Sequence, residues 1–242
     1  MFNYLANPNR FLRIQQRVQP FLLAATVLVL GYGLYLGLFV APPDYQQGET
    51  VRIMFIHVPA SSLALGIYVF MAVAHAIGFI FRHPLADAAA RAAAPVGAVY
   101  ALISLATGAL WGKPEWGTWW VWDARLTSMF VLFLLYLGYL AVWQAVEEPQ
   151  RAARIAGIVA LVGVINVPII KFSVEWWNTL HQPSSLFRKG GPAIDPSILT
   201  PLLWCMAGFA LLFLTLMLYN LRAEVLARRL RQMELAQAGA AA

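Results

Sequence analysis

The stretch FLLAATVLVLGYGLYLGLFV, residues 21–40, holds twenty residues without one charged side chain. A helix of about 20 mostly apolar residues is long enough to cross the hydrocarbon core of a bilayer. Five more stretches are similarly apolar, with Lys171 as their one charged residue, and they cover residues 54–81, 92–111, 126–146, 155–172 and 198–221. The sequence therefore predicts an all-α integral membrane protein, a bundle of six transmembrane helices.

The composition of the whole chain supports this class. Of the 242 residues, 61% are hydrophobic and only 12% are charged, and the mean hydropathy is +0.67. Soluble domains carry about 25% charged residues, so a soluble enzyme is excluded. The single cysteine, Cys205, excludes an internal disulfide, an iron–sulfur cluster and a cysteine-ligated zinc site.

The basic residues predict the orientation of the chain. Six spans place both termini on one side, and we expect residues 1–242 to form a single membrane domain with a basic tail at 222–242. If the termini are cytoplasmic, eleven of the 17 lysines and arginines lie in inner segments and six in outer ones. The positive-inside rule favours this arrangement in a bacterial inner membrane. Topology then explains the net charge of +6, and no nucleic-acid partner is expected.

An outer loop, residues 111–123, reads WGKPEWGTWWVWD and holds five of the nine tryptophans. Tryptophan favours membrane interfaces, but five in one loop exceed what anchoring requires. If residues 116–126 are helical, they form a short amphipathic surface helix on the periplasmic side, with indole faces that make a platform for a planar apolar ligand. This platform consists of Trp116, Trp119, Trp120 and Trp122, with Asp123 and Arg125 at its edge.

Two of the four histidines lie on the same outer side as the tryptophans. His57 is near the outer end of the second span, and His181 is in the last outer loop. Two histidines from separate elements can supply both axial ligands of a haem iron. The tryptophans would supply flat apolar walls, and Arg52, Arg125 and Lys171 would supply cations for the propionates. The sequence thus favours haem over zinc, which needs three or four ligands.

The other two histidines have simpler interpretations. His75 lies in the middle of a span, where a neutral imidazole bonded to a neighbouring helix is expected, although intramembrane ionisable residues are often functional. His83 precedes Pro84 in an inner loop and is expected to be solvated.

Two missing motifs restrict the chemistry further. The chain has no C-x-x-C-H, so haem would be held reversibly, as haem b, and not covalently. It has no G-x-x-x-x-G-K-[ST], so any ATP-derived energy would come from another subunit. We therefore expect a haem-handling subunit and not an enzyme.

Residues 116–123, WGTWWVWD, match the tryptophan-rich signature W-G-x-x-W-x-W-D throughout. This signature, with six spans and flanking outer histidines, resembles the CcmC (haem exporter protein C) family of cytochrome c maturation. The resemblance implies axial ligation by His57 and His181 and a haem platform formed by the motif tryptophans. It also implies delivery of haem at the periplasmic face to the chaperone CcmE, beside CcmD, CcmB and the ATPase CcmA.

Three other functions stay open at this stage. A transporter could move haem through a polar route past His75 and Asn166. A quinone-linked redox protein could use a bound haem to relay electrons. A scaffold could use the tryptophans only to grip lipid, and it would bind no haem.

Overall fold

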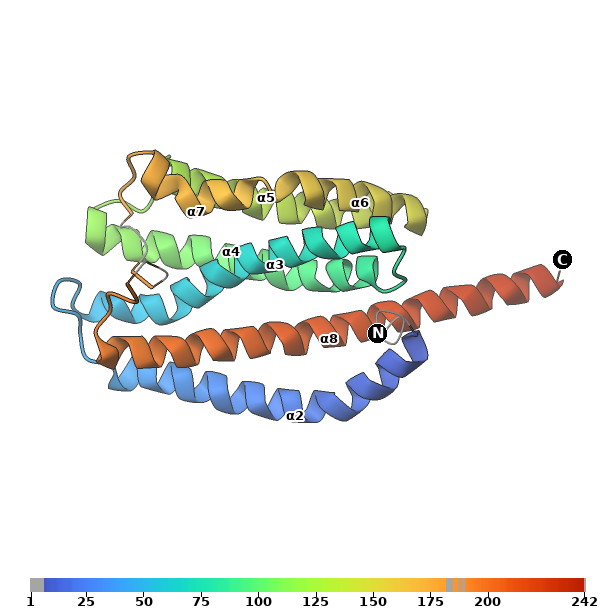
Figure 1. Cartoon of the computed structure of the whole chain (residues 1–242), viewed down its shortest axis with the longest axis horizontal. Coiled ribbons are helices and arrows are strands. Elements are labelled where there is room, and N and C mark those ends of the chain that lie inside the picture. Colours follow the sequence, from blue (N-terminus) through green and yellow to red (C-terminus); the bar gives the residue numbers. More distant parts are fainter. Residues whose placement is uncertain (1–6, 182–184, 187, 189, 242) are drawn as a thin grey trace.

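The computed structural model describes residues 7–181, 185, 186, 188 and 190–241. Within these residues the chain is mostly helical, and six stretches are long and apolar enough to cross a membrane. The long helices run roughly parallel or antiparallel, with the start of α2 and the end of α8 at the same end of the bundle (Figure 1). The prediction of a six-span, all-α membrane protein is confirmed.

The connections between consecutive helices have at most eight residues as far as α7, whereas residues 177–195 separate α7 from α8. The first span joins α2 to a π-helical turn, and the second begins with a 3₁₀ turn that leads into α3. Their bounds are α2 Pro8–Tyr35, η1 Leu36–Val40, η2 Glu49–Ile53, α3 Met54–Phe81, α4 Ala86–Trp116, α5 Ala124–Ala145, α6 Pro149–Gly163, α7 Asn166–Trp176 and α8 Pro196–Ala241.

The fifth span is interrupted between α6 and α7. Pro168 has no backbone N–H and its ring crowds the carbonyl of Val164, the residue four positions earlier, so the regular helix breaks there. The side chain of Asn166, at the start of α7, donates a hydrogen bond to the carbonyl of Ser128 on α5 (2.8 Å). This bond fixes α7 against α5, which is the helix that contributes Arg125 to the site.

Small residues let the central helices approach closely. The contact between α3 and α4 is rich in fully buried alanines, among them Ala60, Ala64 and Ala93. Gly97 makes room for Tyr136, because a Cβ there would lie 2.4 Å from the Tyr136 ring. The Tyr136 hydroxyl donates to the carbonyl of Ala64 (2.7 Å), which joins α5 to α3. Such small-residue packing with interhelical hydrogen bonds is typical of membrane bundles.

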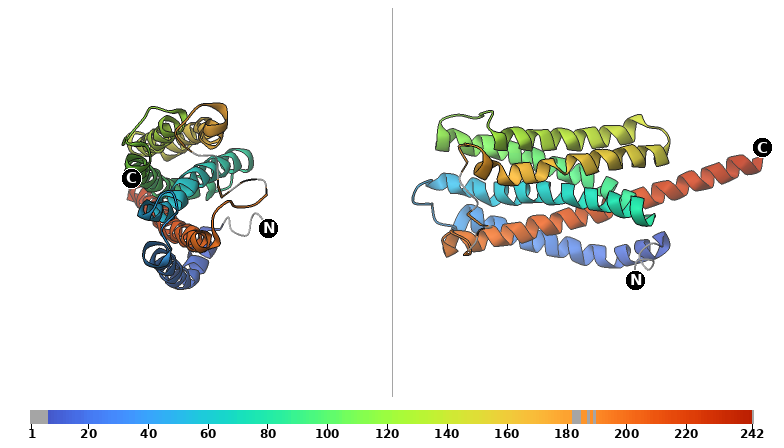
Figure 2. Two further views of the ribbon diagram at one scale, coloured as in Figure 1. Left: turned by 90° about the vertical axis from the view of Figure 1, so that its left-hand side faces the viewer. Right: turned by 45° about the horizontal axis from the view of Figure 1, so that its top comes forward.

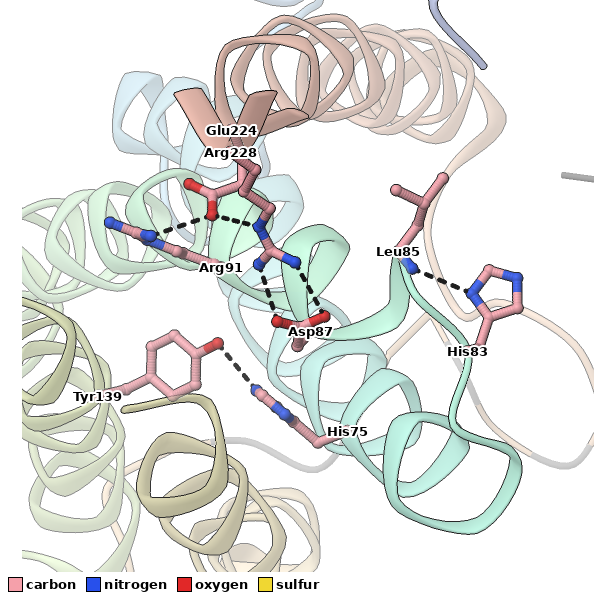
Figure 3. Close-up of polar contacts among 8 residues, drawn as sticks. All are labelled: His75, His83, Leu85, Asp87, Arg91, Tyr139, Glu224 and Arg228. Carbon is pink, nitrogen blue, oxygen red and sulfur yellow. Dashed lines mark hydrogen bonds and ion pairs between the residues drawn. The ribbon is translucent and has the colours of Figure 1, made fainter. Parts of the chain in front are cut away.

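Helices α2 and α8 pack side by side along one flank of the bundle (Figures 1 and 2). Helix α8 continues to Ala241 and projects beyond the bundle. Near this end a charged cluster ties α8 to α4 (Figure 3): Arg228 pairs with Asp87 (2.8 Å) and with Glu224 (2.8 Å), and Arg91 pairs with the same Glu224 (3.0 Å).

The tryptophan-rich segment is not the surface helix that the sequence predicts. Helix α4 runs on to Trp116 and ends at Gly117, whose φ of 75° is left-handed and suits glycine. Residues 117–123 are irregular, and Thr118 bonds locally to Trp120 (3.0 Å). Asp123 is extended and caps α5. The prediction of helix over residues 116–126 was wrong because a glycine C-cap and an aspartate N-cap lie six residues apart.

Candidate haem site

A cavity of about 330 Å³ opens at the bundle end where α3 begins and α4 ends. This is close to the lower end of the usual range for ligand sites, roughly 300–1,000 Å³. Four separate elements contribute to its wall: His57 from α3, Trp116 from α4, Arg125 from α5 and His181 from the segment after α7. The structure therefore brings His57 and His181 to one space, although they are far apart in the sequence.

The ring of His57 is held by α4. Its Nδ1 atom lies 3.0 Å from the hydroxyl of Thr107, and Trp111 contacts the ring edge-on at 5.6 Å between centroids. Gly108 leaves space for the imidazole, since a Cβ there would lie 3.1 Å from its Cε1 atom. Three residues of one helix thus determine how His57 presents itself to the cavity.

The ring of His181 is held by the tryptophan-rich segment. Its centroid lies 4.7 Å from that of Trp116, and its Nδ1 atom lies 3.4 Å from Oδ2 of Asp123. Burial, and secondly the charge of Arg125, lower the pKa of His181, while Asp123 opposes the shift. His181 is therefore neutral at pH 7, and a neutral imidazole is the form that binds iron.

The predicted cations separate into two groups. Arg125 and Lys171 line the cavity, where they can meet anionic groups of a ligand. Arg52 does not line it: its guanidinium pairs with Glu49 (2.5 Å) and bonds the carbonyl of Leu38 (2.7 Å) at the end of the first span. The structure therefore does not bring Arg52 to the predicted site, because these contacts hold it at a helix end.

The motif tryptophans also divide. Trp116 lines the cavity, whereas Trp119 and Trp122 are 55% and 73% exposed and are not among the lining residues. Trp120 packs against Trp122 (5.4 Å) and against Phe130 on α5 (6.2 Å). A single platform of four tryptophans is thus not formed, because the irregular backbone after Gly117 exposes Trp119 and Trp122 and packs Trp120 against α5.

The donor set of the cavity fits a haem. It offers two imidazoles, indole walls and two cations, whereas a porphyrin iron needs only two axial ligands from protein. Among the described residues no group of three or more His, Cys, Asp or Glu side chains could hold a bare metal ion. Several buried polar atoms of the cavity wall and the tryptophan-rich segment also lack a hydrogen-bond partner within the described part of the chain: Gln47 Oε1, Trp111 Nε1, Trp120 Nε1, Asp123 Oδ2 and His181 Nδ1.

His75, near the end of α3, and His83, between α3 and α4, lie near the opposite end of the bundle; Figure 3 shows both side chains. The Nε2 atom of buried His75 lies 2.9 Å from the hydroxyl of Tyr139 on α5, which confirms the expected bond to a neighbouring helix. His83 is half-buried, and its Nδ1 atom accepts a hydrogen bond from the backbone N–H of Leu85 (3.3 Å).

Sequence reasoning missed the residues that surround His57. Thr107, Gly108 and Trp111 lie about fifty positions further on, and only the pairing of α3 with α4 brings them to it. A GxxW spacing of small and aromatic residues at the end of a span was visible, but apolar spans carry many such pairs. The pairing of spans was the information that the sequence lacked.

Comparison with known proteins settles the family. The family model described as "Heme exporter protein C" matches residues 1–236. The chain belongs to this family. It is 56% identical over 234 residues to the heme exporter protein C of Bradyrhizobium diazoefficiens, covering 97% of this chain and 89% of the relative.

Two further relatives show how widely the heme exporter protein C family extends. The Escherichia coli K12 protein of that name is 49% identical over 222 residues, covering 92% of this chain and 89% of the relative. A Marchantia polymorpha protein, named a putative cytochrome c biosynthesis ccmC-like mitochondrial protein, is 41% identical over 209 residues, covering 86% and 89%. The resemblance inferred from residues 116–123 is confirmed.

Proposed function

We propose that this protein handles haem for cytochrome c maturation by binding haem b reversibly in the cavity between His57 and His181. The observation that carries the proposal is the meeting of these two imidazoles in one cavity with Arg125 and Lys171. The names of the relatives support haem as the cargo.

Each lining residue has a distinct part in this proposal. His57 and His181 ligate the iron from two elements, so that either bond can break while the other holds. Arg125 and Lys171 face the propionates, where a charged hydrogen bond contributes about 1.5–3 kcal/mol. Trp111 and Trp116 cover the apolar macrocycle, at roughly 25 cal/mol for each Å² of apolar surface removed from water.

We place the cavity on the periplasmic side of the inner membrane, with both termini cytoplasmic. The positive-inside distribution supports this orientation. Reporter fusions at Gly48 and Gly191 should then be periplasmic and a fusion at Glu148 cytoplasmic. A cytoplasmic signal at Gly48 would place the haem site on the wrong side for delivery.

The acceptor in this proposal is the haem chaperone CcmE, with CcmB, CcmD and the ATPase CcmA as companion subunits, as the family resemblance implies. The indoles of Trp119 and Trp122 follow the cavity residue Trp116 along the chain, and because they are exposed they offer an apolar surface to an incoming acceptor. In this arrangement the tryptophan-rich segment connects the haem to the acceptor.

A haem route through the bundle is a weaker candidate. A second cavity of about 970 Å³ lies at the opposite end and includes His75, but the two cavities share no lining residue. Tyr68 and Tyr136 are fully buried, and they lie in the core between the levels of Leu65 and His75 on α3. This packing supports lateral entry of haem from the lipid.

The experiment that tests the proposal compares single histidine variants of the purified protein. His57→Ala and His181→Ala should each lower the haem retained per protein at least tenfold, because each removes an axial ligand. His83→Ala is the matched control and should retain haem like the parent. Parental retention in either His57→Ala or His181→Ala would refute the proposed site.

A further inference from the structure

A hydroxyl group lies near each ring nitrogen of His57, and the first belongs to Thr107. Thr107 Oγ1 lies 3.0 Å from His57 Nδ1 and donates its own proton to the carbonyl of Ile103 (2.6 Å). A hydroxyl has one proton to donate and lone pairs to accept. Because the proton of Thr107 is committed to Ile103, Thr107 can only accept at its contact with the imidazole.

A second hydroxyl lies near the other ring nitrogen. Ser61 Oγ is 3.4 Å from His57 Nε2, but it is much closer to the carbonyl of His57 (2.7 Å), to which it donates. Ser104 Oγ lies 2.6 Å from Ser61 Oγ and can donate to it. The proton of Ser61 is therefore committed to the backbone, and none is directed at Nε2.

These two assignments fix the neutral tautomer of His57. A neutral imidazole carries one N–H and one lone pair, and its partners decide which nitrogen has which. At Nδ1 the partner can only accept, so the proton lies there. At Nε2 no proton is supplied, so the lone pair lies on the nitrogen beside Ser61, within the lining of the cavity.

We propose that Thr107 is a positioning residue that holds His57 as the Nδ1–H tautomer and directs the Nε2 lone pair to the iron. This proposal rests on the proposed function for the identity of the ligand, but the tautomer itself is a property of the ligand-free protein. Ligating histidines generally donate their other N–H to an oxygen, and loss of that oxygen weakens metal binding 10–100-fold.

The surroundings of Thr107 make it suited to this task. It lies one turn before Trp111, which contacts the same imidazole, and next to Gly108, which leaves the ring its space. The bond from Thr107 to the Ile103 carbonyl is the ordinary helical back-bond of a threonine. The oxygen is therefore held rigidly by α4, whereas His57 belongs to α3.

The test measures the tautomer directly in ligand-free protein. Histidine-selective ¹⁵N labelling and NMR in nanodiscs distinguish a protonated from an unprotonated ring nitrogen, and a His57→Asn sample identifies the His57 signals. We expect Nδ1–H in the parent and in Thr107→Ser, which keeps the hydroxyl. Thr107→Val, which removes it, should show a mixture with the Nε2–H form, as should Thr107→Ala if the valine variant fails to fold.

Two control variants isolate the contribution of Thr107. Ser61→Ala should keep the parental tautomer, because Ser61 donates to the backbone and not to Nε2. Thr215→Val removes a buried threonine hydroxyl on α8 that is bonded to Thr26 (2.7 Å), away from His57, and should change neither the tautomer nor haem affinity. A change of tautomer in Ser61→Ala would overturn the assignment.

Haem titration separates this inference from the proposed function. Thr107→Val should bind haem 10–100-fold more weakly than the parent, and Thr107→Ser should bind within a few-fold of it. An unaltered His57 tautomer in Thr107→Val would overturn the inference, whatever the haem affinity. Parental haem affinity in His57→Ala would overturn the proposed function while leaving the tautomer result standing.

Discussion

The Oδ2 atom of Asp123 lies 3.4 Å from Nδ1 of His181, while its Oδ1 atom accepts the backbone N–H of Leu126 at 2.8 Å. One carboxylate thus caps α5 and faces the imidazole in the cavity. His57 also has an oxygen beside Nδ1, but there the Thr107 hydroxyl lies within hydrogen-bond distance at 3.0 Å, whereas Asp123 Oδ2 and His181 Nδ1 face each other without a hydrogen bond. In both histidines an oxygen lies next to Nδ1, which leaves Nε2 as the nitrogen available to a metal.

The first prediction concerns this carboxylate. Asp123→Asn should preserve the helix cap, because asparagine is an equally good N-cap residue. It removes the negative charge beside His181, so haem affinity should fall about tenfold or more while thermal stability changes little. Asp123→Ala should lose the same affinity and a further ~1 kcal/mol of stability. Parental haem affinity in Asp123→Asn would show that the carboxylate serves only as a cap.

The second prediction separates the tryptophans. Trp116→Ala should weaken haem binding about tenfold, because Trp116 lines the cavity and contacts His181. Trp119→Ala and Trp122→Ala should leave haem content within twofold and instead reduce transfer to the acceptor, since both indoles are exposed. Haem per protein and covalent haem on the acceptor measure the two effects. Equal losses in both assays for Trp122→Ala would assign it to the binding wall.

The third prediction compares two arginines. Arg125→Ala should keep much of the haem spectrum but impair transfer, because a lost propionate contact of about 1.5–3 kcal/mol changes how the porphyrin is turned. Arg52→Ala is the matched control and should not alter the spectrum, because Arg52 bonds the end of the first span. A spectral change in Arg52→Ala together with a silent Arg125→Ala would reverse these roles.

The fourth prediction concerns pH. Burial, followed by the charge of Arg125, lowers the pKa of His181 below its ordinary 6.5. The folded protein therefore keeps this imidazole neutral as the pH falls through 6.5, whereas the unfolded chain takes up a proton there. The contribution of the neutral His181 side chain to stability is therefore full above pH 6.5 and declines below that pH.

Haem retention should depend on the same protonation, because only a neutral imidazole binds iron. Arg125→Gln and Asp123→Asn should shift the pH at which haem is lost in opposite directions. Removing the arginine charge raises the pKa of His181, so haem loss on acidification should begin at a higher pH. Removing the aspartate charge lowers the pKa of His181 further, so haem loss on acidification should begin at a lower pH. The measurement is haem retention between pH 8 and pH 5, and shifts in the same direction would contradict the electrostatic account.

The fold was largely predictable because its signals are local. Uncharged apolar stretches such as residues 21–40 specify spans regardless of how these pack. The signals for the helix ends were also present in the sequence: Pro168, which breaks the fifth span near Val164, and the caps Gly117 and Asp123. The spacing of the tryptophans nonetheless predicts a helix, but the glycine and the aspartate that bound the segment end the helices on either side of it.

The site was predictable only in part. The sequence indicated that His57, His181, Trp116 and Arg125 share one side of the membrane, and the structure brings them to one cavity. The positive charge and the predicted side of the membrane are the same for Arg125 and Arg52, so the sequence could not distinguish them. The difference arises because the end of the first span exposes the carbonyl of Leu38, which binds Arg52. Thr107 could not be predicted, because an apolar span gives no indication of its partner helix.

The most direct test of the central claim is the absorption spectrum of the haem-loaded protein and of its His57→Gly and His181→Gly variants, each recorded with and without added imidazole. Ligation by both histidines predicts a six-coordinate low-spin spectrum in the parent, loss of the low-spin form in either variant, and its recovery when imidazole fills the vacated position. A parental low-spin spectrum in either glycine variant without imidazole would contradict the account.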